Sequence, residues 1–496
     1  MAGMKGLFKD TAIYGLSSML GRFINWFLTP FYTFYLAKAE LGALSNYYAG
    51  KALILILLIM GLETGFFRFA GNPDEDKNRV YSTCLLLVSV VSLLFVGVVS
   101  VFYQPIANFI GAVAHPDYVL ILAVIIALDA IASIPFVYLR LNNHPWVFAS
   151  IKLTSIGLNI VLNLFFILLC PALVKWGYGE WIDWFYREDY NLGYVLWSNL
   201  ISSLVTLLLL SRYIIRVRFT LDFSLVKRIV RYSAPLVVLG LAGVMNQHLD
   251  KLIYPYLLPD DSTAWEQLGV YAANAKIAVI LVMFTQAFRF AFEPFIFSRH
   301  GGEDKRRAYA DATKFFVISG LFIFLAVIFY MDIIKNLIHS SYHDGLKVIP
   351  IIMFADLFNG VFFNLSLWYK LTDRTHWGAW FSVGGLVIVV IGNVIFVPII
   401  GYMACAWSAF ACYMVLMLVS YFMGQHYYPV PYNLKRIALY VVVALVLWGV
   451  AFTFAPATMV GRLLFNTLLL FVYIGVVLKL DMPLASLPIV GKYFKK

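Results

Sequence analysis

Residues 80–104 read VYSTCLLLVSVVSLLFVGVVSVFYQ, a run without one charged side chain. A helix rises ~1.5 Å per residue, so this run would be roughly 37 Å long and would cross a hydrocarbon layer of about 30 Å. A membrane-spanning strand would need only about ten residues with alternating polarity, and this run is continuous and longer. The stretch therefore predicts a transmembrane helix rather than a barrel strand.

Apolar runs of the same kind fill the chain. They lie at 11–37, 42–67, 80–104, 117–139, 146–170, 191–211, 232–257, 267–297, 311–331, 347–370, 376–397, 400–423, 434–455 and 459–480. Of the 496 residues, 62% are hydrophobic and only 13% are charged, which is too little charge for a soluble domain of this size. The sequence predicts an all-α polytopic membrane protein with about fourteen spans, and it excludes secreted, nucleic-acid-binding and cytosolic enzyme classes.

The net charge of +11 comes from Lys and Arg residues that gather in alternate connections, most densely at 212–231. Short loops rich in Lys and Arg stay on the cytoplasmic side of a membrane. The excess charge therefore indicates topology rather than a nucleic-acid partner. It predicts an even number of spans with both termini in the cytoplasm.

One internal repeat bears on the architecture. The tetrapeptide FRFA occurs at 67–70 and again at 288–291, and the same shift carries spans 1 and 2 onto spans 7 and 8. Chance recurrence of four Phe-rich letters is the alternative to duplication. Copies displaced by an even number of spans point the same way, so we expect two six-helix lobes with a cavity between them. The predicted boundaries are an N-lobe at 1–211, a basic cytoplasmic linker at 212–231, a C-lobe at 232–423, and appended spans 13 and 14 with the tail at 424–496.

Three cations lie deep in the predicted spans. Arg22, Lys51 and Lys276 are roughly 18, 13 and 13 Å from the starts of their helices. A charge at mid-bilayer costs at least ~2.5–3.5 kcal/mol, so each needs a reason. One reading is buried ion pairs that fix helix packing. The other is a cationic cavity that receives a diphosphate, with Asn25 and Asn246 adding hydrogen bonds.

Deep carboxylates accompany these cations. Asp129 and Asp356 lie roughly 18 and 13 Å from the starts of spans 4 and 10, and Glu63 lies in span 2. They are expected either as ion-pair partners of the cations or as H⁺ or Na⁺ sites that drive a transport cycle. No phosphate-binding loop of the Gly-x-x-x-x-Gly-Lys type is present, so a built-in ATPase is not predicted. No cofactor and no metal site is expected.

Two arginines are expected at the cytoplasmic headgroup level, since Arg68 and Arg289 come ~39 and ~33 Å after the starts of their helices. They are either interfacial anchors or parts of a vestibule that collects an anionic headgroup. Glu293 follows Arg289 by four residues, next to Pro294, which suggests a local pair near a bend.

The segment NQHLDK at 246–251 is unusually polar for a membrane helix and precedes Pro255. An outer gate or an unwound turn at Asp250 and Lys251 is therefore predicted. The connection 171–190 is the only stretch with enough acids for an intramembrane glycosyltransferase, and it is short. No catalytic residue is predicted.

Several short motifs carry a family resemblance: KDTAIYGL at 9–16, TPFY at 29–32, LG at 41–42 and GLETGFFRFA at 61–70. They resemble the polysaccharide-transporter branch of the multidrug/oligosaccharidyl-lipid/polysaccharide exporter superfamily. The resemblance implies a bacterial inner-membrane flippase that moves undecaprenyl-diphosphate-linked sugar repeats outward by alternating access, using cationic residues of a central cavity. Such repeats serve cell-surface polysaccharides of the O-antigen (lipopolysaccharide) or capsule type.

The resemblance also sets the expected partners and the alternatives. Expected partners are the lipid-linked oligosaccharide, membrane lipids, and a polysaccharide polymerase with its chain-length machinery. Within the same superfamily, a lipid II flippase or a cation-coupled drug exporter is the runner-up. A drug exporter should tolerate loss of the cavity cations and depend on an acid.

Overall fold

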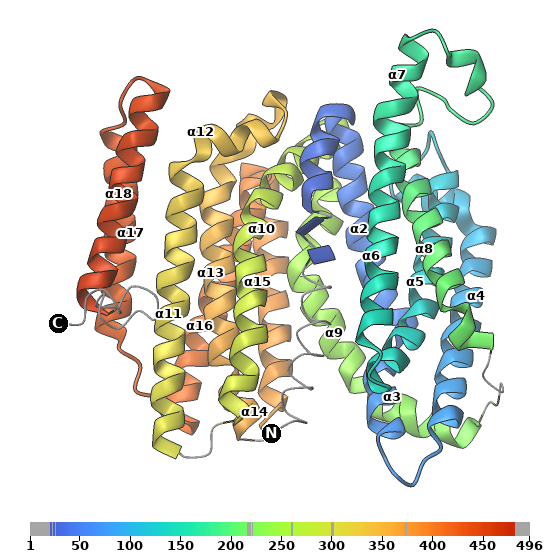
Figure 1. The fold of residues 1–496 in the computed structure, drawn as a ribbon, viewed down its shortest axis with the longest axis horizontal. Helices are drawn as coiled ribbons and strands as arrows, with labels where there is room; N and C mark the ends of the chain where they lie inside the picture. Colours follow the sequence, from blue (N-terminus) through green and yellow to red (C-terminus); the bar gives the residue numbers. More distant parts are fainter. Residues whose placement is uncertain are drawn as a thin grey trace. The chain divides into compact units, whose positions relative to one another are not determined.

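The computed structural model describes residues 20–481, except 22, 25, 216–219, 221, 259–260, 299–301 and 373. In these described ranges the chain is helical and contains no strand (Figure 1). Thirteen helices are long and apolar enough to cross a membrane. The all-helical, multi-pass membrane fold is thereby confirmed. The first predicted span, 11–37, lies partly outside the described residues.

Each apolar run from 42 onwards coincides with one or more helices, several of which extend beyond the run. The first half contains α2 (Lys38–Ile59), α3 (Leu62–Ala70), α4 (Lys77–Phe109), α5 (Asp117–Leu141), α6 (Pro145–Leu164), a π-helical turn (Phe165–Leu169), α7 (Cys170–Lys175), α8 (Asn191–Ile215) and α9 (Phe223–Leu257). The second half contains α10 (Asp261–Ser298), α11 (Gly302–Phe329), α12 (Met331–Ile334), α13 (Ile349–Leu365), α14 (Leu367–Leu371), α15 (His376–Ile400), α16 (Met403–Tyr427), α17 (Leu434–Thr453) and α18 (Met459–Leu480).

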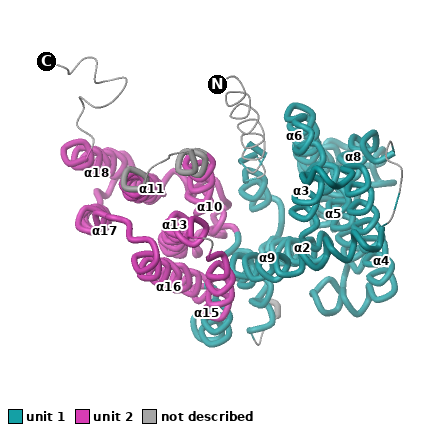
Figure 2. The backbone as a smooth tube through the Cα atoms, turned by 90° about the horizontal axis from the view of Figure 1, so that it is seen from below, with its two compact units in different colours: residues 1–272, 389–402 teal, residues 273–388, 403–496 magenta. Residues whose placement is uncertain are grey.

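Packing divides the chain into two compact units (Figure 2). Unit 1 comprises residues 1–272 and 389–402, and unit 2 comprises residues 273–388 and 403–496. This division rests on packing alone, and the lobe boundaries inferred from the repeat stay a prediction.

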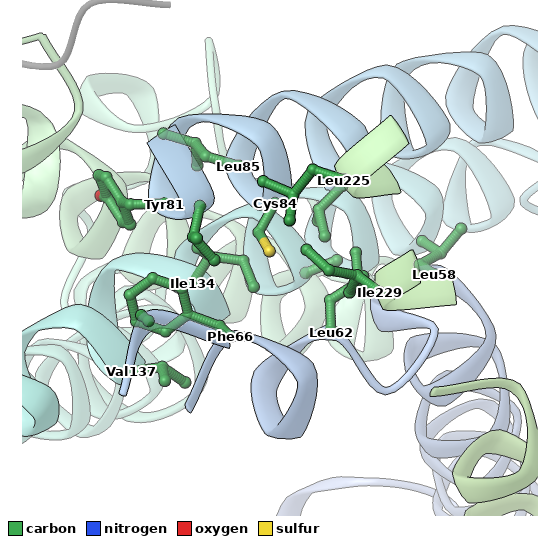
Figure 3. Packing of buried hydrophobic residues seen from close by; sticks show 14 of the residues in the cluster. Leu58, Leu62, Phe66, Tyr81, Cys84, Leu85, Ile134, Val137, Leu225 and Ile229 are labelled. Atoms are coloured by element: carbon green, nitrogen blue, oxygen red, sulfur yellow. The ribbon is translucent and has the colours of Figure 1, made fainter. Parts of the chain in front are cut away.

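Unit 1 has a continuous apolar core in which α3 and α9 pack against α4 and α5 (Figure 3). Its fully buried members come from all four helices; they include Leu62, Phe66, Tyr81, Cys84, Leu85, Ile134, Val137, Leu225 and Ile229. All four cysteines of the chain, Cys84, Cys170, Cys405 and Cys412, are buried free thiols. They serve as packing residues, as their apolar sequence surroundings indicate.

One predicted span is in fact two helices. The run 42–67 was expected as a single helix, but the helix ends at Ile59, and Met60 and Gly61 adopt left-handed conformations with φ of 50° and 67°. The cause is the close packing of this turn against α9. A Cβ on Gly61 would lie 3.2 Å from the Cβ of Ser233, whose hydroxyl donates a hydrogen bond to the Gly61 carbonyl. The apolar run continues through residues 60 and 61, so the hydropathy of the sequence does not indicate the turn.

We expect Gly61→Ala to lower the stability of the protein by about 1–2 kcal/mol, because an L side chain is strained at φ near +60° and has no room beside Ser233. The measurement is the thermal unfolding midpoint of the purified protein. Gly97→Ala is the matched control, because Gly97 lies in α4 with open space around it. Equal midpoints for the two variants would contradict this account of the turn.

The last two helices are fastened to α11 in unit 2. The Asp481 carboxylate accepts a hydrogen bond from Lys314 Nζ at 2.8 Å and another from the Tyr440 hydroxyl at 2.5 Å. The Tyr473 hydroxyl of α18 donates to the Ile318 carbonyl of α11 at 3.0 Å. Because these groups are buried or half-buried, the bonds orient α17 and α18 more firmly than apolar contact alone would.

The basic connection before α9 is also fastened within unit 1. Asp222 accepts hydrogen bonds from the backbone N–H groups of Ser224 and Leu225, which caps α9, and it pairs with Arg79 at 2.5 Å. Arg228 pairs with Glu75 at 2.6 Å. This cap explains why α9 begins at Phe223, whereas the apolar run had predicted a start at 232.

We expect the Asp222→Asn variant to be less stable than the wild type at neutral pH but not at acid pH. The Leu225 and Ser224 N–H groups and the Arg79 guanidinium lower the pKa of Asp222 in the folded chain. A lowered pKa stabilises the fold above the ordinary value of about 3.9, and this contribution is lost as the pH falls through the folded value. The gap in unfolding midpoint should therefore close below about pH 4. Asp74→Asn, at an exposed neighbouring position, should show no such pH-dependent gap.

Candidate functional site

An ion pair lies deep in unit 1. Lys51 Nζ of α2 lies 2.8 Å from Asp129 Oδ2 of α5, and the Ser203 hydroxyl of α8 donates to Asp129 Oδ1 at 2.7 Å. At 1.5 Å per residue, Lys51 is ~20 Å from the start of α2 and Asp129 is ~18 Å from the start of α5, so the pair is near mid-membrane. The side chains are 17% and 31% exposed, so the pair is only partly buried.

Neutral polar groups complete the surroundings of Lys51. Its ammonium donates to the Asn199 side-chain oxygen at 3.5 Å, and the Asn199 amide donates to the Tyr48 hydroxyl at 3.1 Å. An ammonium has three N–H donors. Asp129 and Asn199 take two of them among the described residues, so one donor of Lys51 can serve a bound anion.

A further charged residue within the spans, Lys152 of α6, was not among the residues singled out from the sequence. Its Nζ lies 4.1 Å from the centroid of the Phe136 ring, and the side chain is half-buried. Lys152 forms no ion pair with a described residue, although it lies within electrostatic range of Asp129 and Glu63. Partial burial of an ammonium without a paired carboxylate costs free energy, so Lys152 is a candidate residue for binding an anion.

Arg140 and Glu63 lie towards the end of unit 1 where α5 meets α6. The Arg140 guanidinium is 3.7 Å from Glu63 Oε2, a loose ion pair, and its carbon lies 5.6 Å from the centroid of the Phe67 ring. Among the described residues, the buried Nε–H of Arg140 has no hydrogen-bond acceptor. The Arg140 side chain as a whole is 37% exposed, so its guanidinium can donate hydrogen bonds to an anionic ligand.

These residues form one group, the unit 1 charge cluster, defined as Lys51, Asp129, Lys152, Glu63 and Arg140. It has three cations against two carboxylates, a net charge of +1, and it runs from mid-membrane to the end of the helices. Lysines offer point charges and arginine a planar fork to phosphate oxygens. The arrangement can attract and hold an anion with more than one charge.

Other predicted site residues lie elsewhere or outside the described part of the chain. Arg22 and Asn25 are not among the described residues, and the side chain of Glu293 is likewise outside them. Lys276 is exposed on α10 and Asp356 is half-buried on α13, both in unit 2, whereas Asn246 is half-buried on α9 in unit 1. Their roles in substrate binding or ion coupling stay predictions.

The two arginines of the repeated tetrapeptide each pack on an aromatic ring of their own unit. The guanidinium carbon of Arg68 lies 4.2 Å from the centroid of Tyr232, and that of Arg289 lies 3.4 Å from the centroid of Phe363. Cation–π contacts of this kind hold the planar guanidinium group against the ring. Both the anchor and the vestibule reading fit this geometry.

Asp250 and Lys251 of α9 contact α2 and the first part of α10, all within unit 1. The buried Asp250 carboxylate accepts a hydrogen bond from the Tyr271 hydroxyl at 2.7 Å and pairs with Lys251 at 3.4 Å. The Asn46 amide of α2 donates to the Lys251 carbonyl at 2.8 Å. Helix α9 continues through these residues to Leu257, so the unwound turn is not found, and the proposed gate stays a prediction.

A metal site is not apparent in the part of the chain that the structure describes, where no three His, Cys, Asp or Glu side chains are grouped to hold an ion.

Comparisons with known proteins agree on family and fold. A family model described as "Polysaccharide biosynthesis protein" matches residues 7–298. A structure of lipid II flippase MurJ in an inward closed conformation superposes with a TM-score of 0.74 at 14% identity, covering 94% of this chain and 98% of that chain. An inward-facing multidrug resistance MATE family transporter of the MOP superfamily gives 0.64 at 14% identity, covering 84% and 94%. No curated protein sequence matches the chain significantly.

Proposed function

Since the chain belongs to the polysaccharide biosynthesis protein family, we propose that it is a flippase for undecaprenyl-diphosphate-linked oligosaccharide repeat units in the bacterial inner membrane. The resemblance noted in the first two helices is confirmed at the level of the family. The repeat units would cross from the cytoplasmic to the outer face by alternating access, for surface polysaccharide of the O-antigen or capsule type. Both termini would lie in the cytoplasm.

The observation that carries the proposal is the net positive charge of the unit 1 charge cluster. A diphosphate brings two or more negative charges, which would be balanced by the ammonium of Lys152 and the partly exposed guanidinium of Arg140. A carrier of cationic drugs would need the opposite balance, with carboxylates in excess. The cluster therefore favours an anionic substrate over a drug cation.

The ion pair offers a way to couple substrate and ion. A diphosphate that binds Lys152 would compete with Asp129 for Lys51, because the diphosphate and the carboxylate are both attracted to the Lys51 ammonium. Release of Asp129 from Lys51 would leave a half-buried carboxylate that favours uptake of H⁺ or Na⁺. Substrate and coupling ion would then occupy unit 1 in the same step, which is a proposal for the energy source of the cycle.

Lipid II is the second candidate substrate, because it presents the same diphosphate and the fold is shared with the lipid II flippase MurJ. The unit 1 charge cluster does not discriminate between the two lipids, since it would bind their phosphates and not their sugars. The family to which the chain belongs favours the oligosaccharide carrier.

The test is reconstitution of the protein into liposomes that contain a fluorescent undecaprenyl-diphosphate oligosaccharide, with lipid II in a parallel set. Exposure of the sugar is followed by its accessibility to an impermeant glycosidase or periodate. We expect the oligosaccharide lipid to equilibrate between leaflets faster than in protein-free liposomes. Faster movement of lipid II alone would assign the second candidate, and no movement of either lipid would contradict the proposal.

A further inference from the structure

The connection after α7 exposes an unusual number of aromatic side chains. Trp176, Tyr178, Trp181 and Trp184 are 67%, 53%, 78% and 84% exposed. We call residues 176–190 the tryptophan loop. Tryptophan is large and apolar, so three nearly uncovered indoles in one short loop indicate a surface that meets a partner.

The loop is ordered by its own small core. Ile182 and Tyr186 are buried against Cys170 and Tyr194. The Tyr194 hydroxyl accepts a hydrogen bond from the Arg187 N–H at 2.6 Å and donates to the Phe185 carbonyl at 3.2 Å. With Ile182 turned inward, its neighbours Trp181 and Trp184 face outward. Because the backbone is held, the indoles are presented in place, and binding costs little ordering entropy.

The loop lies beyond the ends of the neighbouring helices of unit 1. The helical segment Pro145–Lys175 has 31 residues, whereas α5 and α8 have 25 each. A turn of three residues joins the end of α5 to the start of α6, so these two helix ends lie at the same level. The extra length of the segment Pro145–Lys175, about 9 Å, therefore projects at its other end. Figure 1 shows α7 and the following loop projecting past α5 and α8. The loop that carries the indoles therefore lies beyond the ends of the neighbouring helices of its own unit.

The charge of the loop argues against a lipid surface. Four acids, Glu180, Asp183, Glu188 and Asp189, stand against Lys175 and Arg187, and all six side chains are exposed. Anionic headgroups would be repelled by this excess of carboxylates. Carboxylates are strong hydrogen-bond acceptors for hydroxyl groups, and indole faces pack against the C–H faces of a ring. Flat apolar faces beside acceptors suit a sugar better than a lipid.

We propose that the tryptophan loop is a carbohydrate-binding site that takes the pyranose rings of the oligosaccharide at the end of unit 1 opposite Arg140. The inference rests on the proposed function for its substrate class, and it adds a second contact, to the sugar, away from the diphosphate site. Trp181 and Trp184 stack on sugar rings, while Glu180 and Asp183 accept hydrogen bonds from hydroxyls.

The test uses the full-length protein in lipid nanodiscs and free oligosaccharides without a lipid carrier. The probes are repeat-unit oligosaccharides released from the surface polysaccharide of the cell in which the protein occurs. Maltohexaose is included as a comparison oligosaccharide of simple composition. We expect the repeat-unit oligosaccharide to bind by calorimetry and the double variant Trp181→Ala/Trp184→Ala to weaken binding at least tenfold. Trp146→Ala is the matched control, because Trp146 is 68% exposed at the opposite end of the same helical segment.

Two results would overturn the carbohydrate site. One is no binding of the released oligosaccharide, or equal binding by the wild type and the double variant. The other is quenching of tryptophan fluorescence by brominated lipids in the nanodisc that is markedly smaller in the double variant than in the wild type, which would make the loop a membrane anchor. Neither result depends on transport, so failure of the sugar site and failure of the flippase proposal are distinguishable.

Discussion

Lys152→Glu is expected to slow transport of the diphosphate-linked oligosaccharide at least 100-fold. The change turns three cations and two carboxylates into two cations and three carboxylates, so the cluster becomes net negative. Two charges ~8 Å apart interact by about 2 kcal/mol at an effective dielectric constant of 20, and reversal doubles the loss. A loss of about 4 kcal/mol corresponds to a nearly thousandfold weaker binding of the diphosphate. The expected effect of at least 100-fold is smaller because solvent screens part of the charge interaction.

The measurement is the rate of sugar exposure in liposomes, with folding of each variant checked by its unfolding midpoint. Lys152→Arg should retain most of the rate, because the positive charge is kept. Lys435→Glu makes the same charge reversal at an exposed position at the start of α17 and should transport normally. A folded Lys152→Glu protein that transports at the wild-type rate would remove Lys152 from the site.

The second large effect concerns the Lys51–Asp129 pair, where stability and transport should respond differently. Lys51→Met leaves a half-buried carboxylate without its cation and should cost about 1–2 kcal/mol of stability, less than for a fully buried pair because the Asp129 side chain is 31% exposed. Lys51→Met/Asp129→Leu removes both charges and should regain most of that stability. Transport should be lost in the single variant and stay lost in the double variant.

This comparison separates the two readings of the ion pair. If the pair only fixes the packing of α2 on α5, the double variant should recover transport along with stability. The same outcome is expected for the exchanged pair Lys51→Asp/Asp129→Lys under a purely structural role. Recovery of transport in either variant would therefore rule out a direct role of Lys51 in substrate binding.

The sequence predicted the spans well because membrane helices are decided by long apolar runs. The runs at 434–455 and 459–480 agree with α17 and α18 to within two residues. Elements decided by local packing were missed. The break at Met60 and Gly61 lies inside an apolar run, and only the glycines at 61 and 65 in the motif could have indicated it.

The site was partly predicted for a similar reason. Depth along the helix identified Lys51 and Asp129, and their pairing was one of the two readings left open. Lys152 escaped because it lies ~10 Å from the start of its helix, a depth from which a lysine usually reaches the interface. Only the packing of α6 against α5, which places the ammonium over Phe136, shows that it stays inside. Sequence gives depth but not the direction in which a side chain points.

The burial of all four native thiols has a practical consequence for topology mapping. A maleimide reagent that cannot cross membranes should leave the wild-type chain unlabelled, so single cysteines can be introduced without first removing the native ones. Trp146→Cys places a reporter at the start of the helical segment Pro145–Lys175, and Trp184→Cys places one in the loop that follows its other end. If the termini face the cytoplasm, the reagent added to intact spheroplasts should label the cysteine at position 184. The cysteine at position 146 should be labelled only after the spheroplasts are lysed.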